Sequence, residues 1–141
     1  MEPRIFSNEP LAPDSEIVLT GNAQAHVSKV LRLREGAAVV LFDGSGLEFA
    51  ARIESVTRRG VAIAVGTGRD PGTESRLAVT LVQGICRGQR MDLLIQKSTE
   101  LGIASIRPVH CERSVVRLDA ARASRKTGHW RQIAISACEQ S

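Results

Sequence analysis

The side chains of this sequence that could do chemistry gather between Gln83 and Ser141, at the predicted ends of strands and helices. The segment Gly84-Ile85-Cys86-Arg87-Gly88 joins a predicted strand to a predicted helix, the place where α/β sheets hold ligands. Its glycine spacing fits neither a dinucleotide fingerprint nor a phosphate-binding P-loop. By itself, the segment therefore favours a plain strand-to-helix turn.

Two further segments carry side chains suited to anion or acid–base chemistry. Arg113, after the second predicted strand of the C-terminal half, could offer a planar donor fork to a phosphate or a base carbonyl. Glu139-Gln140-Ser141 stands at a helix end, where polar residues are usually just solvated. Lys97 and Glu100 are three residues apart, and the sequence alone favours a surface ion pair worth about 0.2–0.5 kcal/mol.

The spacing of cysteines and histidines predicts no metal site. The three cysteines are odd in number and widely spaced, which argues against a disulfide framework and offers no zinc pair: Cys86, Cys111 and Cys138. Their apolar surroundings predict buried, reduced thiols. The histidines share no metal-ligand spacing: His26, His110 and His129.

The net charge of +4 is unevenly distributed. Residues 1–76 carry 9 basic and 10 acidic side chains, whereas residues 77–141 carry 10 and 5. Most of the excess comes from Arg107, Arg113, Arg117, Arg122, Arg125, Lys126 and Arg131. Such a cluster suits a polyanion such as RNA, and the alternative is an ordinary solvated helix face. With no Tyr, one Trp and three Phe, the sequence argues against recognition by rows of stacked aromatics.

The first half predicts a small antiparallel barrel. Strands are expected at 4–6, 16–19, 38–42, 47–53 and 61–65, with tight turns at 43–46 and 58–60. A helix is expected after Asn22, stopping at Gly36. Residues 66–75 are rich in turn formers and predict a linker.

The second half predicts a parallel sheet with helices on its faces. Residues 77–82 are typical of a strand buried on both faces, and 103–109 form the next strand. Helices are expected over 89–101, stopped by Gly102, and from near Ser124 onward. Two strands are too few to bury their own faces, so either another chain completes the sheet or the sequence is a fragment.

Several motifs together resemble the RsmE family, S-adenosylmethionine-dependent methyltransferases that act on N3 of a uridine in 16S, small-subunit ribosomal RNA. They are Gln-Lys-Ser-Thr-Glu-Leu-Gly at 96–102, Glu-Arg-Ser-Val-Val at 112–116 and Ala-Cys-Glu-Gln-Ser at 137–141. In the first half, residues 3–6, 26–34 and 41–44 resemble the family's PUA-like RNA-binding barrel. The chain departs from the family at Gln89 and Ser136, where Asp and Glu are common.

The resemblance implies an α/β fold class with an all-β N-terminal domain: a PUA-like small β-barrel over 1–72, then the first half of a SPOUT (trefoil-knot) α/β domain over 77–141. Family members continue for roughly another hundred residues, which form the knot and hold the cofactor. We therefore expect the S-adenosyl-L-methionine site to lie mostly outside this chain, with no cofactor-binding residue within it, and the 141 residues to be inactive alone. We also expect a homodimer when complete.

The resemblance supplies the reaction type but no list of catalytic residues, so the candidates follow from what methyl transfer to N3 requires. Arg113 is the candidate for stabilising the uracil oxyanion, and Glu139 is the candidate for accepting the N3 proton. Pocket-shaping residues are expected at Lys97, Glu100, Ser114 and Gln140, and RNA contacts at Arg4, Lys29, Arg32, Arg34 and Arg117.

Two other classes of function remain open: a non-catalytic RNA-binding module and an unrelated nucleotide-binding α/β protein. No apolar run approaches the roughly 20 residues that span a bilayer, and the N-terminus lacks a signal-peptide core. We therefore expect a cytoplasmic protein that binds neither membrane nor metal.

Overall fold

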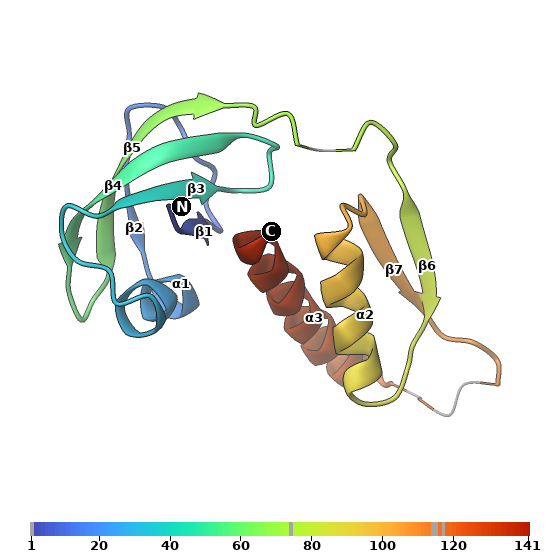
Figure 1. Cartoon of the computed structure of the whole chain (residues 1–141). Coiled ribbons are helices and arrows are strands. Elements are labelled where there is room, and N and C mark those ends of the chain that lie inside the picture. Colours follow the sequence, from blue (N-terminus) through green and yellow to red (C-terminus); the bar gives the residue numbers. More distant parts are fainter. Residues whose placement is uncertain (1, 74, 114–115, 117) are drawn as a thin grey trace. The chain divides into compact units, whose positions relative to one another are not determined.

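The chain forms two compact units, residues 1–73 and 74–141. The structure is a computed structural model that describes residues 2–73, 75–113, 116 and 118–141 (Figure 1). Within these residues, every helix is too short or too polar to cross a membrane. The predicted fold class, an all-β unit followed by an α/β unit, is confirmed.

The first unit is built on a curled five-stranded sheet (Figure 1). Its strands are β1 (Arg4–Phe6), β2 (Glu16–Leu19), β3 (Ala38–Phe42), β4 (Glu48–Val56) and β5 (Val61–Arg69), in the spatial order β1-β3-β4-β5-β2. All pairs are antiparallel except β1 and β3, which run parallel with Ile5 opposite Leu41. The expectation of a wholly antiparallel barrel was therefore wrong at β1. The long connection between β1 and β3 lets the chain return in the same direction, which a tight hairpin does not.

Strand β5 continues through residues 66–69, which the sequence predicted to be linker. Its partner β4 is long enough to pair with this part, with Phe49 opposite Gly68. A Cβ on Gly66 would lie 2.8 Å from the carbonyl oxygen of Ala50, and one on Gly68 would lie 2.8 Å from the Phe49 ring. The glycines therefore permit a close approach of neighbouring groups inside the sheet rather than marking a linker.

Helix α1 (Gly21–Ala25) is followed by a π-helical turn, η1 (His26–Val30), where one longer helix was expected. Thr20, not Asn22, occupies the N-cap position of α1. Val27 of η1 is fully buried in the core of the unit, together with Ile5, Val39, Leu41, Phe49, Val61 and Ile63.

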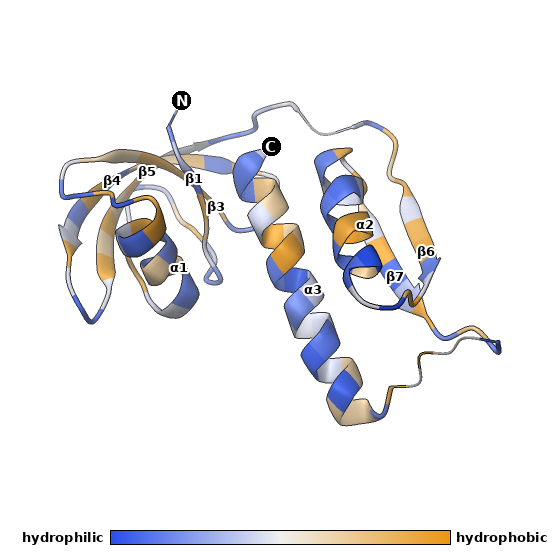
Figure 2. Cartoon of the chain, turned by 60° about the horizontal axis from the view of Figure 1, so that its bottom comes forward, coloured by the Kyte–Doolittle hydropathy of each residue, from blue (hydrophilic) through white to orange (hydrophobic). Residues whose placement is uncertain are grey.

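The second unit contains β6 (Thr80–Gly84), α2 (Gln89–Glu100), β7 (Ser105–Val109) and α3 (Ala120–Gln140). Strands β6 and β7 are parallel, as predicted, with Gly84 opposite Val109. Both helices lie on the same side of the strand pair (Figures 1 and 2). Met91, Ile95 and Trp130 form the buried core between them, and Ile106 of β7 packs against it.

Three expectations for this unit were wrong. Strand β6 is not buried on both faces: Val82 is 62% exposed, because the helices cover one side only. Helix α3 begins four residues earlier than Ser124, because Asp119 caps it by accepting a hydrogen bond from the Arg122 backbone N–H at 2.8 Å. No cysteine is fully buried, and Cys111 is exposed because it lies in the loop after β7.

Candidate functional site

The loops that follow β6 and β7 leave the sheet at the same edge. Gly84 and Val109 stand opposite each other as the last residues of their strands, and the backbone N–H of Ile85 donates to the carbonyl oxygen of Val109 at 3.1 Å. This carboxyl edge is where open α/β sheets bind ligands.

The loop from Gly84 to Gly88 is more specialised than the plain turn that its sequence favoured. A Cβ on Gly84 would lie 2.9 Å from the Cys111 sulfur, so the Cys111 thiol occupies the space that a side chain at position 84 would need. Gly88 adopts φ +59° and ψ −143°, a conformation essentially reserved for glycine, and stands at the N-cap of α2. Gly88 places no side-chain cap on the N-terminus of α2, and Asp92 lies in the first turn of that helix.

Two cavities join this edge to helix α3. The strand-edge cavity, of about 170 Å³, is lined by Ile85, Cys86, Arg87, Gly88, Val116, Leu118, Lys126 and Trp130. The basic groove, of about 380 Å³, is lined by Leu118, Arg122, Arg125, Lys126 and His129. Leu118 and Lys126 line both, so the two cavities are neighbours.

Helix α3 is fixed against α2 by a polar contact and a buried indole. His129 Nε2 lies 2.9 Å from Asp92 Oδ2, in the first turn of α2. The Trp130 side chain is 7% exposed, and its buried Nε1–H has no hydrogen-bond acceptor among the described residues. Trp130 also lines an apolar cavity between α2, β7 and α3.

The two predicted catalytic residues are not brought together. Arg113 is exposed in the loop after β7, seven residues before α3 begins at Ala120. Glu139 is the last residue but one of α3, whose 21 residues rise about 30 Å. Ser114 and Arg117 lie outside the described residues.

Lys97 and Glu100 form the ion pair that their spacing predicted, with Nζ 2.8 Å from Oε2. Gln96 Nε2 donates to the other oxygen of Glu100 at 2.9 Å. These hydrogen bonds, from Lys97 first and then Gln96, hold the pKa of Glu100 below its usual value. The pair lies in the last turn of α2, away from the carboxyl edge, and Gln140 is exposed at the end of α3.

Three predicted RNA contacts lie close together in the first unit. Lys29, Arg32 and Arg34 are exposed on η1 and the turn that follows, beside the 67% exposed Val30. Arg32 adopts φ +52°, which is uncommon for a residue with a side chain, and π-helical turns such as η1 are frequent at functional sites. Buried Val27 anchors this stretch, so its charges project into solvent.

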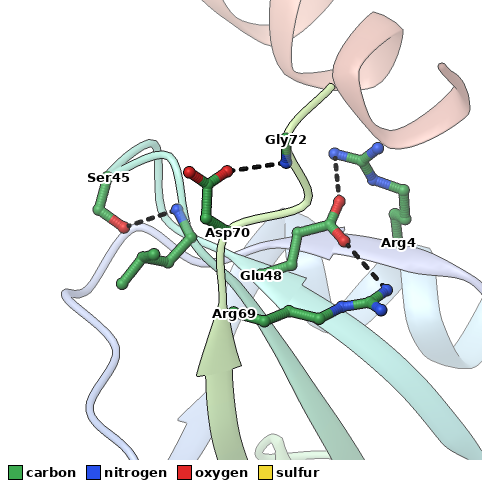
Figure 3. Close-up of polar contacts among 7 residues, drawn as sticks. Arg4, Ser45, Glu48, Arg69, Asp70 and Gly72 are labelled. Atoms are coloured by element: carbon green, nitrogen blue, oxygen red, sulfur yellow. Dashed lines mark hydrogen bonds and ion pairs between the residues drawn. The ribbon is translucent and has the colours of Figure 1, made fainter. Parts of the chain in front are cut away.

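Arg4, the other predicted RNA contact, is engaged within the first unit (Figure 3). Its Nη2 lies 3.2 Å from Glu48 Oε1, and Arg69 Nη2 lies 3.7 Å from Glu48 Oε2. The Glu48 side chain is only 10% exposed, so two arginines balance a nearly buried carboxylate. Arg4 therefore has a structural contact that Lys29, Arg32 and Arg34 do not share.

The basic groove gathers three residues that the sequence already placed in its cluster of positive charge: Arg122, Arg125 and Lys126. His129 follows them on the same helix face and completes the polar lining. The sequence predicted no such role for His129, because its spacing from the other histidines indicated only that it is no metal ligand.

Family models match both units of the chain. Residues 19–65 match an RNA methyltransferase PUA domain, and residues 73–141 match an RNA methyltransferase domain. Among curated proteins, ribosomal RNA small subunit methyltransferase E of Bacillus subtilis is 32% identical over 123 residues, which are 87% of this chain and 48% of that protein.

Solved structures agree with these matches. A ribosomal RNA small subunit methyltransferase E from Neisseria gonorrhoeae, bound to S-adenosyl methionine, superposes with a TM-score of 0.92 at 38% identity, covering 99% of this chain and 57% of that one. A protein from Legionella pneumophila in complex with the cofactor SAM gives a TM-score of 0.93 at 36% identity, covering 99% and 58%.

The fold and the matched models define an RNA methyltransferase domain preceded by its PUA domain. The chain belongs to the family of ribosomal RNA small subunit methyltransferase E, as its motifs implied. It spans about half the length of the curated relatives it matches, 48% and 54% of the first two.

Proposed function

We propose that the protein containing this chain is an S-adenosylmethionine-dependent methyltransferase that acts on N3 of a uridine in small-subunit ribosomal RNA, in the cytoplasm. The observation that carries this proposal is the likeness, over 99% of the chain, to a ribosomal RNA small subunit methyltransferase E solved with S-adenosyl methionine. In this proposal, residues 1–72 are the RNA-binding domain and residues 77–141 are part of the methyltransferase domain.

Among the described residues at the carboxyl edge, the strand-edge cavity is small for a cofactor. The strand-edge cavity, at about 170 Å³, is smaller than the roughly 300–1,000 Å³ of ordinary small-molecule sites. We therefore propose that the cofactor, which supplies the methyl group, is held mainly by the part of the protein outside this chain. It follows that the 141 residues alone bind it negligibly and are inactive.

Methyl transfer to N3 of uracil requires loss of the N3 proton and stabilisation of the charge that develops on the carbonyl oxygens. Arg113 is exposed in the loop after β7 and has the charge and donor geometry for that oxyanion. Glu139 lies at the other end of α3, so one copy of this chain does not bring both side chains to one nucleotide. We propose that, in a homodimer, Glu139 of one copy reaches the uracil that Arg113 of the other copy contacts.

The experiment that tests the function is transfer of tritiated methyl from S-adenosylmethionine to small-subunit ribosomal RNA by the complete protein. The modified position is then mapped by the block that a methyl on the Watson–Crick edge causes in reverse transcription. Transfer to a uridine at N3 supports the proposal. RNA binding without transfer would instead support a non-catalytic module, and preferential binding of NAD or ATP a different nucleotide-binding protein.

The homodimer is tested by mixing two variants of the complete protein, Arg113→Ala and Glu139→Gln. If the two side chains come from different copies, mixed dimers contain one intact site and regain activity that neither variant has alone. If mixing restores nothing although mixed dimers form, the shared site is wrong.

A further inference from the structure

We propose that the basic groove on the first half of α3 binds the sugar–phosphate backbone of an RNA strand and leads it to the carboxyl edge of β6 and β7. This inference rests on the proposed function, which supplies RNA as the substrate. It adds a binding surface in the methyltransferase unit to the one that the PUA domain implies.

The charge of the groove is not neutralised within the described part of the chain. Asp119 serves as the N-cap of α3, with Oδ2 3.5 Å from Arg122 Nε. Asp92 is engaged by His129. In the ranges that the structure describes, neither Arg125 nor Lys126 has a carboxylate within ion-pair distance. Two exposed cations therefore face the groove with their charge available to a ligand.

The arrangement of these cations fits a chain of phosphates rather than one small anion. Arg122, Arg125, Lys126 and His129 lie along one face of α3, over a rise of about 10 Å. A site for a single anion requires hydrogen-bond donors that converge on one point. A row of charged side chains along a helix instead suits the regularly spaced phosphates of a polymer backbone. The hydrophilic colouring of the first half of α3 agrees with a solvated face (Figure 2).

The groove also lies beside the carboxyl edge of the strands. Lys126 lines both the groove and the strand-edge cavity, whose wall includes Gly88 at the N-terminus of α2. Trp130 lines the same cavity, and its buried Nε1–H is a donor without an acceptor among the described residues. A donor, a helix dipole and a lysine therefore favour an electron-rich ligand beside the loop that carries Arg113.

Because cationic side chains predominate in the lining of the groove, beside Leu118 and the single imidazole of His129, it should hold the backbone without reading sequence. Such binding depends on salt, since each phosphate contact releases counterions. A protein partner with an acidic surface would bind with a similar dependence on salt. Its competition with RNA for the groove would not, however, depend on the length of the RNA.

The test compares the complete protein with its Arg125→Gln/Lys126→Gln variant in filter binding of radiolabelled small-subunit ribosomal RNA at several salt concentrations. The matched control, Arg58→Gln/Arg59→Gln, removes two adjacent exposed charges from the turn between β4 and β5, outside the groove. We expect the groove variant to lose about tenfold in affinity and to lower the slope of log affinity against log salt by about one to two. The control should stay within about twofold of the parent.

Equal losses in both variants, or no loss in either, would overturn the groove as an RNA site. Binding of S-adenosylmethionine should be the same in all three proteins, and a loss confined to the groove variant would point to the cofactor instead. If the parent binds RNA through the groove yet transfers no methyl, the inference holds and the proposed function fails. If the parent methylates RNA and the groove variant equals the control, the function holds and the inference fails.

Discussion

The guanidinium of Arg4 crosses above the Phe42 ring, 5.1 Å from its centroid, to reach Glu48 at 3.2 Å. Arg4 belongs to β1 and Glu48 to β4, with Phe42 of β3 between them in the sheet. The contact therefore ties three strands together through one side chain (Figure 3).

Removing the charge of Arg4 should destabilise the first unit. In Arg4→Met the aliphatic stem remains, but among the described residues Glu48 keeps only the 74% exposed Arg69 as an ion-pair partner. A nearly buried carboxylate that loses its main partner costs about 1–3 kcal/mol of unfolding free energy. Urea denaturation measures the loss, with the exposed Arg58→Met as control. Adding Glu48→Gln should recover part of the stability; a double variant less stable than either single one would contradict the pairing.

The stability of the first unit should fall in acid partly through Asp43. Burial opposes ionisation of Asp43, but hydrogen bonds from Ser45 and Leu11 outweigh it, so the pKa of Asp43 lies below its usual value. A carboxyl with a lowered folded pKa adds stability above its unfolded pKa of about 3.9 and loses it as pH falls through the folded value. Urea denaturation between pH 6 and the acid range should therefore show a weaker pH dependence in Asp43→Asn than in the control Asp14→Asn.

Two glycine-to-alanine changes in the second unit should act in opposite directions. Gly88→Ala forces a side chain into φ +59°, ψ −143°, which costs about 1–3 kcal/mol. Gly128→Ala lies within α3 with open space around its Cβ, so it should stabilise by about 0.5–1 kcal/mol. Thermal denaturation of both variants gives the signs. A neutral Gly88→Ala would mean that the loop relaxes at no cost.

Hydrogen exchange on the 141-residue chain should be faster in the second unit than in the first. Val39, Leu41, Val61 and Ile63 are fully buried in the five-stranded sheet, whereas Val82 of the two-stranded sheet is 62% exposed. Amides of β6, β7 and the last turn of α3 should therefore open at lower free energy than those of β3 to β5.

The exposed apolar side chains of the second unit should also promote self-association, measurable by sedimentation. Equally strong protection of both units in a monodisperse monomer would refute this prediction.

Local patterns predicted most of the individual elements. Apolar runs located β1 to β7, and the helical spacing of Met91, Ile95 and Trp130 located the inner faces of α2 and α3. The ion pair of Lys97 with Glu100 also followed from spacing alone, because both residues lie on one helical turn. Such signals need only a few consecutive residues, and the ordered motifs of the whole chain sufficed to place it in its family.

The tertiary structure decided what depends on residues far apart in the sequence. The parallel pairing of β1 with β3, and the continuation of β5 through Gly66 and Gly68, depend on which strands became neighbours. The separation of Arg113 from Glu139 follows from the length and direction of α3. The basic groove and the strand-edge cavity are neighbours, with Leu118 and Lys126 lining both, because of how α3 packs in its unit. A sequence pattern constrains the backbone over one or two turns. A site, in contrast, is formed by residues that are far apart in the sequence, and only the packing of the folded chain brings them together.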